Sequence, residues 1–124
     1  MMHSIRFRIL FIALLFSSFT QANPLQSEIR FLKQYIQNSD CHFNRNGDIH
    51  SATEALKHIE KKYQYYQSDI TSAEMFIEKS ASKSTMTGKA YTVICPAAQG
   101  IGQQTLSSKT WLLRALSRYR NSAE

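Results

Sequence analysis

Two histidines and a glutamate with regular spacing are the residues best suited to chemistry in this chain. His50, Glu54 and His58 are four positions apart, so on a continuous helix they would lie roughly on one face. Imidazole and carboxylate groups are common zinc ligands, so this set could serve a metal-binding protein or a metal-dependent hydrolase. The spacing differs from the His-Glu-x-x-His pattern, and a helix cap at Ser51 would leave His50 outside the helix. We therefore predict no cofactor and keep the metal site as the alternative.

The chain contains two cysteines, Cys41 and Cys95. An even number of cysteines in an exported protein favours a disulfide. Free buried thiols and a redox-active pair remain alternatives, although the chain has no Cys-x-x-Cys motif. A zinc cluster with His42 and either His50 or His58 is a further alternative, with which a disulfide would compete. We expect the two cysteines to form a structural disulfide.

Other catalytic patterns are incomplete. Residues 87–89 (Thr-Gly-Lys) resemble the end of a phosphate-binding loop, but Lys83 replaces its first glycine and Ala90 its last hydroxyl residue. The chain has no Gly-x-Ser-x-Gly elbow, and its nine acidic residues are dispersed. These observations predict no catalytic residues and favour a binding protein over an enzyme.

A candidate binding surface combines the turn over residues 45–50, the exposed side of the following helix and the loop over 83–89. Its principal residues are Arg45, His50, His58, Tyr65 and Lys89. Tyrosine is favoured at protein interfaces and its ring can stack on a sugar, so an envelope protein or a glycan is the expected partner. In the alternative interpretation, Tyr63 and Tyr66 belong to the core while Tyr65 and the nearby lysines are merely solvated. A third hypothesis is binding to an anionic surface through Lys61, Lys62, Arg114, Arg118 and Arg120.

The first 22 residues have the pattern of a secretory signal peptide. Arg6 and Arg8 precede an apolar run over residues 9–19, and Thr20-Gln21-Ala22 provides small residues at the cleavage positions. The apolar run is shorter than the roughly 20 residues of a transmembrane helix. We predict cleavage after Ala22, a periplasmic or secreted protein over residues 23–124, and no stable membrane insertion after cleavage. Export also makes nucleic acid an unsuitable partner.

The mature chain predicts one small helix-rich domain. Apolar residues recur at helical spacing over 25–37, and Ser/Thr-x-x-Glu capping boxes at residues 51–54 and 71–74 predict helices extending to about 67 and 82. Residues 41–45 and 91–95 have strand propensity. Residues 97–106 read as a loop, and a final helix is expected over 109–120, capped by Ser107 or Ser108. The order is α-β-α-α-β-α, an α+β fold with a short two-stranded antiparallel ribbon joined by the cysteines.

An ordered set of short motifs is shared with a known family. The motifs are Arg45-Asn46-Gly47, His50-Ser51-Ala52, Glu54-Ala55, His58-Ile59, Lys62, Ser72-Ala73-Glu74, Phe76-Ile77, Ala81-Ser82, Ser84, Thr87-Gly88, Tyr91 and Trp111-Leu112. The chain resembles a family of small exported proteobacterial proteins catalogued as a domain of unknown function. Ser72 replaces the usual threonine and Ile59 the usual leucine. The resemblance implies one exported bacterial domain and assigns no functional residue. We thus predict a non-catalytic binding or accessory protein of the cell envelope.

Overall fold

The structure is a computed structural model that describes residues 12–13, 15, 23–97 and 102–122. Within these residues the helices are α1 (Pro24–Asn38), α2 (Ala52–Tyr66), α3 (Ala73–Ser80) and α4 (Ser108–Ser122), with a short 3-10 turn, η1, at Gln67–Asp69. The strands are β1 (His42–Arg45), β2 (Asp48–His50), β3 (Thr92–Cys95) and β4 (Gln104–Ser107). The predicted α+β class is therefore confirmed. Apart from residues 12, 13 and 15, the predicted signal peptide lies outside the described residues.

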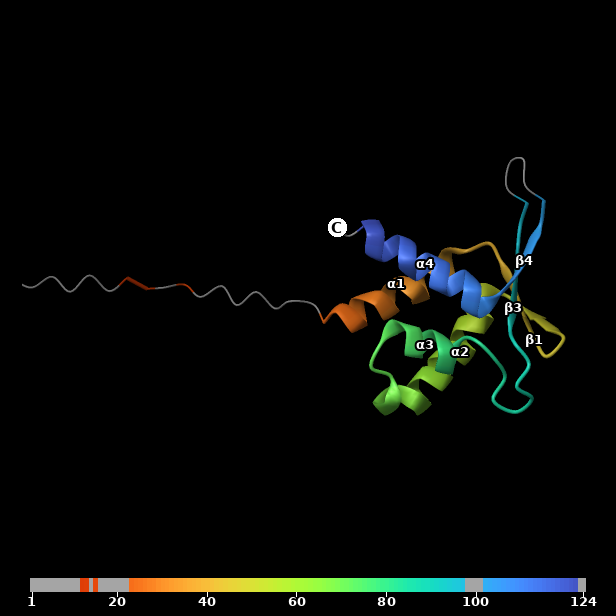
Figure 1. Ribbon diagram of the computed structural model, residues 1–124, viewed down its shortest axis with the longest axis horizontal. Helices are drawn as coiled ribbons and strands as arrows, with labels where there is room; N and C mark the ends of the chain where they lie inside the picture. The colour runs from red at the N-terminus through yellow and green to blue at the C-terminus, as the bar shows by residue number, and fades with distance from the viewer. Residues whose placement is uncertain (1–11, 14, 16–22, 98–101, 123–124) are drawn as a thin grey trace, which may run out of the picture.

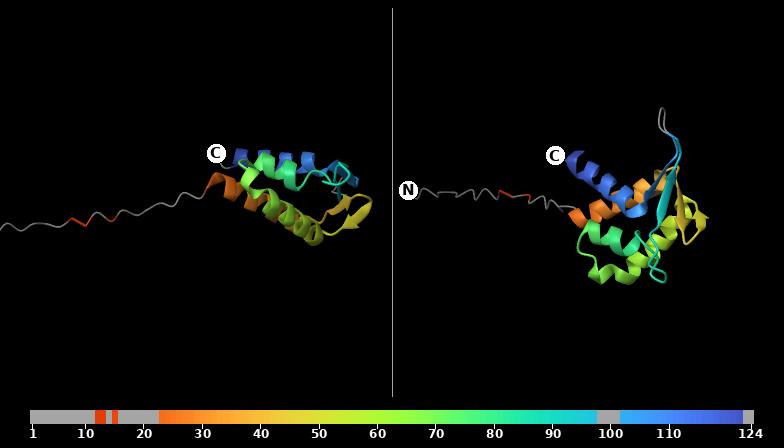
Figure 2. Two further views of the ribbon diagram at one scale, coloured as in Figure 1. Left: turned by 90° about the horizontal axis from the view of Figure 1, so that it is seen from below. Right: turned by 45° about the vertical axis from the view of Figure 1, so that its right-hand side comes forward.

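The four helices pack together, and the sheet stands across one end of them (Figures 1 and 2). The strand order is β2-β1-β3-β4, and all neighbours are antiparallel. Helix α2 contacts β1 and β2, whereas α4 contacts β3 and β4. One half of the sheet is thus supported by α2 and the other half by α4.

The helices form where apolar residues recur every three or four positions, and these residues make the core. On α1 they are Ile29, Leu32 and Ile36, on α2 Ala55, Ile59 and Tyr63, and on α4 Trp111, Leu112, Ala115 and Leu116. Helix α3 adds Phe76 and Ile77, neither of which has measurable exposure. Burying large apolar side chains contributes roughly 1.5–3 kcal/mol each, so this shared core holds the helices together.

The predicted helix caps are correct in part. Ser51 Oγ accepts a hydrogen bond from the Glu54 amide at 3.2 Å, as the capping box predicts. The reciprocal bond is replaced, because the Glu54 carboxylate bonds His50 instead. The cap of α3 is one residue later than predicted: Ser72, not Thr71, has the extended cap conformation and accepts from the Met75 amide at 3.1 Å.

The predicted two-stranded ribbon is the central β1–β3 pair of a larger sheet, so the prediction missed two strands. Strand β2 follows a tight turn at Asn46 and Gly47, whose φ angles of 54° and 90° suit a two-residue hairpin. Strand β4 begins within the segment predicted as a loop over 97–106, ends one residue beyond it and pairs with β3. Its first residues, Gln104 and Thr105, are exposed at the sheet edge and lack the apolar alternation that marks a strand. Residues 98–101 of that predicted loop lie outside the described residues.

The predicted disulfide is confirmed, with Cys41 Sγ and Cys95 Sγ 2.06 Å apart. Cys41 immediately precedes β1 and Cys95 ends β3, so the bond closes the central strand pair at one end. The alternative of two free buried thiols and the cysteine-containing zinc cluster are therefore wrong. The disulfide fixes a contact between positions 54 residues apart in the chain.

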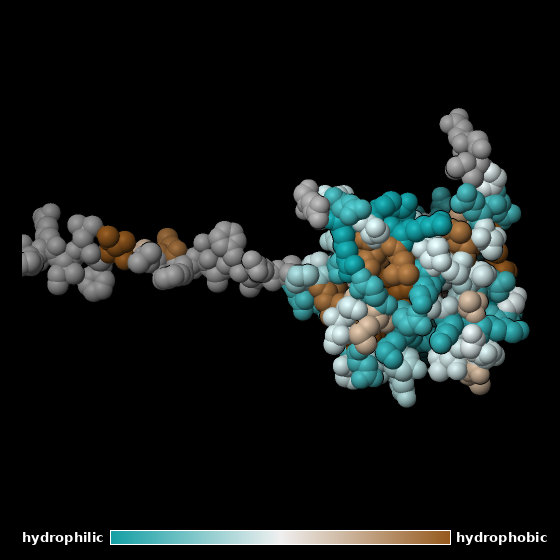
Figure 3. Space-filling view, viewed as in Figure 1, coloured by the Kyte–Doolittle hydropathy of each residue, from teal (hydrophilic) through white to brown (hydrophobic). Residues whose placement is uncertain are grey.

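One face of the described structure is mainly hydrophilic (Figure 3). Figure 3 shows polar side chains over most of one face, with the largest apolar patch over the middle of the helical layer. Among the described residues, no helix has the length and apolar character needed to cross a membrane.

Candidate functional site

The three segments of the predicted binding surface lie next to one another. Thr87 Oγ1 in the 83–89 loop donates a hydrogen bond to Asn46 Oδ1 in the β1–β2 turn at 2.8 Å. Lys62 Nζ on α2 donates to the backbone oxygen of Lys83 at 2.6 Å. Segments separated along the chain are thus joined by direct contacts around one site.

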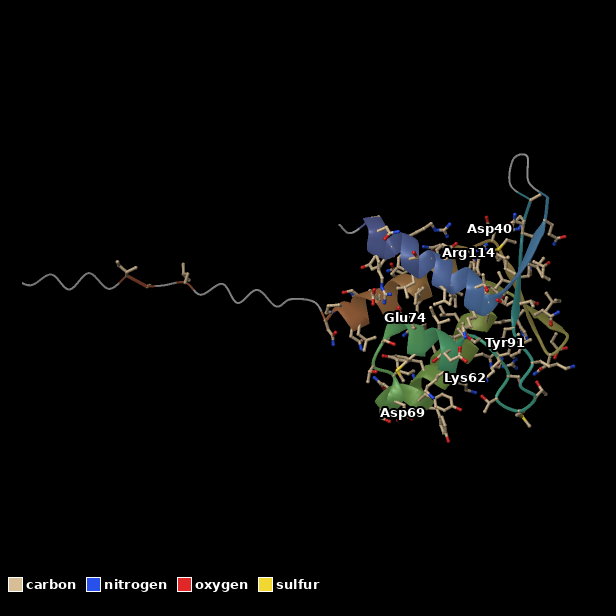
Figure 4. The ribbon with its side chains drawn as sticks, viewed as in Figure 1. Asp40, Lys62, Asp69, Glu74, Tyr91 and Arg114 are labelled. Atoms are coloured by element: carbon tan, nitrogen blue, oxygen red, sulfur yellow. A yellow bond between two sulfur atoms is a disulfide. The ribbon has the colours of Figure 1, made fainter. Side chains whose placement is uncertain are left out.

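The centre of this site is a cluster of half-buried polar side chains, Arg45, His50, His58, Lys62 and Tyr91, which we term the basic pocket. Arg45, His50, His58 and Tyr91 line a small cavity of about 20 Å³. The rest of its lining is Phe43 and Asn44 of β1, Ala55 and Ile59 of α2, Ala81 and Ser108. Lys62 Nζ donates to Tyr91 Oη at 3.3 Å, and the two side chains lie beside each other in Figure 4. A cavity of this size accommodates about one water molecule.

Secondary structure places each of these groups. Arg45 ends β1, His50 ends β2, and His58 and Lys62 are one turn apart on α2. Tyr91 is held just before β3, since its amide donates to the Ser82 oxygen and its own oxygen accepts from the Ser108 amide, both at 2.9 Å. Loop, strand and helix contacts therefore fix the pocket before any ligand binds.

A shallow, open cavity of about 700 Å³ also involves the two histidines. It is lined by residues of α2 and by Gln37 at the end of α1, and it shares His50 and His58 with the smaller cavity. The two histidines thus border both hollows.

His50 is oriented by Glu54 and leaves one nitrogen unused. Its Nδ1 lies 3.0 Å from Glu54 Oε2, a geometry in which the imidazole donates to the carboxylate. This hydrogen bond is the main reason why the pKa of Glu54 is below its ordinary value. His50 Nε2 is buried without a hydrogen-bond partner in the described structure, and the ring meets that of His58 edge-on at 5.7 Å.

Burial and mutual repulsion disfavour further positive charge in the pocket. The pKa of His58 is lowered by burial first and then by the charges of Arg45 and His50. Burial is also the main cause that lowers the pKa of Lys62 and raises that of Tyr91. His58 is therefore favoured as the neutral imidazole near pH 7, and the positive charges of the pocket are those of Arg45 and Lys62.

Arg45 and Lys62, the arginine and lysine of the basic pocket, have no carboxylate counter-ion among the described residues. The ion pairs of the described structure involve Lys33 with Glu60, His50 with Glu54, Lys109 with Glu78, and Arg120 with Glu28 and Glu74. Neither Arg45 nor Lys62 is in one of them. A half-buried cation that lacks an opposite charge favours the binding of an anion.

The structure does not support the predicted metal alternative of His50, Glu54 and His58. Glu54 is occupied as the hydrogen-bond partner of His50. Across the described ranges, no group of three or more His, Cys, Asp or Glu residues has an arrangement suited to a metal ion. The rings of His50 and His58 are neighbours, but no third metal-ligating side chain among the described residues joins them.

Two residues of the predicted surface lie apart from the pocket. The Tyr65 side chain is 80% exposed and packs edge-on against Tyr66, and Lys89 is exposed in the loop. Neither lines the cavities around the histidines. Tyr63 is buried in the core, as the alternative interpretation of the tyrosines has it.

The five cations of the predicted anionic-surface hypothesis do not form one patch. Arg120 is paired with Glu28 and Glu74, and Lys62 is directed to the 83–89 loop. Arg114 and Arg118 line a different cavity, beside the disulfide. That hypothesis is therefore not supported by how the structure distributes these charges.

Tyr91 was not predicted as a site residue, although the sequence contains a signal for its position. In the β1–β3 register Asn44 is opposite Thr92 and His42 is opposite Ile94. Continuing that register in each direction pairs Cys41 with Cys95 and Arg45 with Tyr91. A disulfide between antiparallel strands therefore already implied that Arg45 and Tyr91 would face each other.

Comparisons with known proteins identify relatives but no activity. The model of a family described as "Family of unknown function (DUF5329)" matches residues 23–120. An uncharacterized protein, YfeK, of Salmonella typhimurium is 43% identical over 60 residues, which are 48% of this chain and 50% of the relative. The chain thus spans about half the length of the curated relative that it matches. No solved structure matches the chain significantly.

Proposed function

This chain belongs to the family of unknown function DUF5329. Since the family has no assigned activity, we propose a function from the geometry of the chain itself. The protein is a non-catalytic binding protein of the bacterial cell envelope, and its basic pocket binds an anionic group of the partner. The observation that carries this proposal is the half-buried Arg45 guanidinium, which no described carboxylate neutralises. The small cavity of about 20 Å³ admits no more than a water molecule, so a carboxylate or phosphate would meet Arg45 from its solvent-exposed side. There it would supply the missing charge and accept paired hydrogen bonds from the guanidinium.

The neighbouring groups support a binding role more than a catalytic one. Lys62 already donates to Lys83 and Tyr91, and His50 is engaged with Glu54. These bonds hold the side chains in place around Arg45. General acid–base catalysis would instead need a titratable group free to exchange its proton with a substrate.

Export to the envelope is supported by two features of the chain. Residues 1–22 have the signal-peptide pattern, and the Cys41–Cys95 disulfide is of a kind that persists in oxidising compartments. The test is the intact mass of the protein in a periplasmic extract. We expect a chain that starts at Asn23 and gains two hydrogens on reduction; a cytoplasmic chain with free thiols would contradict the assignment.

The anion site is tested by NMR titration of the purified protein with inorganic phosphate and with acetate. We expect the amide signals of Arg45, His58 and Tyr91 to shift in a saturable way, with an affinity that falls as salt rises. Arg45→Gln should weaken binding about tenfold or more, since it removes charge-assisted hydrogen bonds. Arg30→Gln, which removes an exposed charge of α1 outside the pocket, is the matched control.

Two results would overturn the anion-binding proposal. One is the absence of saturable shifts at the basic pocket with either anion. The other is an Arg45→Gln variant that is folded and binds as well as the Arg30→Gln control. A photo-crosslinker at Asn46, which is exposed beside the pocket, then tests the cellular setting: capture of a defined envelope protein or glycan is expected, and its loss in Arg45→Gln ties capture to the pocket.

A further inference from the structure

A second cavity, which the proposed function does not use, lies between α1, α4 and the disulfide end of the sheet. It is a groove of about 720 Å³, within the range of roughly 300–1,000 Å³ typical of small-molecule sites. Asp40 and Arg114 both line it, and Figure 4 labels them on the side where α4 approaches the sheet. We term it the disulfide groove, because Cys41 and Cys95 are part of its wall.

Aromatic side chains form one part of the disulfide groove. Phe31 and Tyr35 on α1 and Trp111 on α4 line it. They belong to a connected series of rings: Phe31 stacks on Tyr119 with centroids 4.3 Å apart, and Tyr35 meets Trp111 at 4.7 Å. This mutual packing fixes the ring positions. Trp111 is only 7% exposed, so the half-buried rings of Phe31 and Tyr35 supply the preformed apolar platform that a ligand would meet.

Planar polar groups form the other part. The amides of Gln34, Asn38 and Gln104 line the groove and belong to exposed residues. An amide presents a donor and an acceptor side by side, which matches two adjacent hydroxyl groups. A pyranose ring has this dual character, because its C–H faces stack on aromatic rings while its edges carry neighbouring hydroxyls. The lining thus fits a sugar better than a lipid chain, which would leave the amides without partners.

The charge balance of the groove favours an acidic sugar. Arg114 and Arg118 line it together with a single carboxylate, that of Asp40. Neither arginine forms an ion pair within the described residues. Arg118 Nη2 donates to Tyr35 Oη at 3.0 Å, which holds its guanidinium beside the aromatic platform. Arg114 is exposed and has no such anchor, so it is the group best placed to meet an anion.

We infer that the disulfide groove is a second binding site, for a short saccharide that carries a carboxylate. The aromatic rings receive the sugar faces, the amides of α1 and β4 bind its hydroxyls, and Arg114 binds the carboxylate. The inference is independent of the basic pocket, because the two sites share no lining residue.

The test compares two disaccharides that differ in one carboxylate. The purified protein with its disulfide intact is titrated by NMR with N-acetylglucosaminyl-N-acetylmuramic acid and, separately, with the neutral disaccharide N,N′-diacetylchitobiose. We expect saturable shifts at Gln34, Asn38 and Gln104, and about tenfold tighter binding of the acidic sugar. Arg114→Gln should abolish most of that difference, whereas Arg30→Gln should preserve it.

Each other outcome overturns the inference as stated. Absence of binding by both sugars excludes a saccharide site in the groove. Equal affinity for both sugars would mean that Arg114 does not bind the carboxylate. If the acidic sugar shifts only the amide signals of Arg45 and Tyr91, it binds in the basic pocket. That result would support the proposed function and contradict this second site. Gln34→Ala, a change at an exposed helix position, provides a variant that tests the amide contact without altering charge.

Discussion

Replacing both Cys41 and Cys95 by alanine should lower the free energy of unfolding by about 4 kcal/mol. The bond spans 54 residues, and the chain-entropy model assigns about that value to a loop of this length. Cys41 is only 8% exposed, so the loss of its sulfur leaves a small void that adds up to roughly 1 kcal/mol. A small domain has a total stability of roughly 5–15 kcal/mol, so the bond supplies a large share of it.

The assay is urea unfolding of the wild-type protein and the double variant, followed by far-ultraviolet circular dichroism. Thermal unfolding should show a fall in Tm of about 15–30 °C, given the 4–8 °C per kcal/mol of a domain of this size. The wild-type protein unfolded in the presence of a reductant is the control. Its midpoint should approach that of the variant, because both lose the same covalent constraint.

A loss smaller than about 1 kcal/mol would refute this reasoning, because it would mean that the unfolded chain is not restricted by the bond. A variant that does not fold remains informative. The oxidised wild-type protein should then have an unfolding free energy below about 5 kcal/mol, and a clearly larger value would contradict the estimate.

Three further changes test the contacts around the core. The pKa of His58 is lowered by burial and by Arg45, so the unfolded chain binds the proton more readily than the folded protein does. The free energy of unfolding should therefore fall as pH drops below about 6.5, and His58→Gln should make it less dependent on pH in urea titrations. Arg120→Gln removes ion pairs that join α4 to α1 and α3, and because these groups are partly exposed a loss of about 0.5–1 kcal/mol is expected, which high salt should diminish. Ser72→Ala removes the hydrogen bond from the Met75 amide to the capping hydroxyl and should lower the free energy of unfolding, measured by chemical denaturation, by about 1 kcal/mol. An unchanged denaturation midpoint would show that Ser72 does not stabilise the start of α3.

The helices were predictable because their signals are local. Apolar spacing on α1, α2 and α4 and the Ser51 cap each depend on residues within a few positions of one another. Even the displaced cap of α3 involves a shift of a single residue. The cysteines predicted a covalent contact because an exported chain with two of them favours a disulfide.

Strand β4 was not predictable, because its pairing makes it a strand. It is polar and exposed at its start, and pairing with β3 gives its backbone hydrogen bonds. Strand β2 is different, because the Asn46-Gly47 turn that folds it back on β1 is a local hairpin signal. Tertiary context therefore overrides weak local propensity in β4, whereas β2 was missed although its turn is visible in the sequence.

By itself the sequence determined the helices, the α+β class, the presence of paired cysteines and the groups available for chemistry. The tertiary structure alone decided which of these groups meet. It turned Glu54 toward His50 and brought Lys62 against the 83–89 loop, whereas the Arg45–Tyr91 pair already followed from the register that the disulfide implies. The physical reason is that helix periodicity and capping act over a few residues, whereas a binding site depends on long-range pairing whose loop-closure cost is met only when the whole core forms.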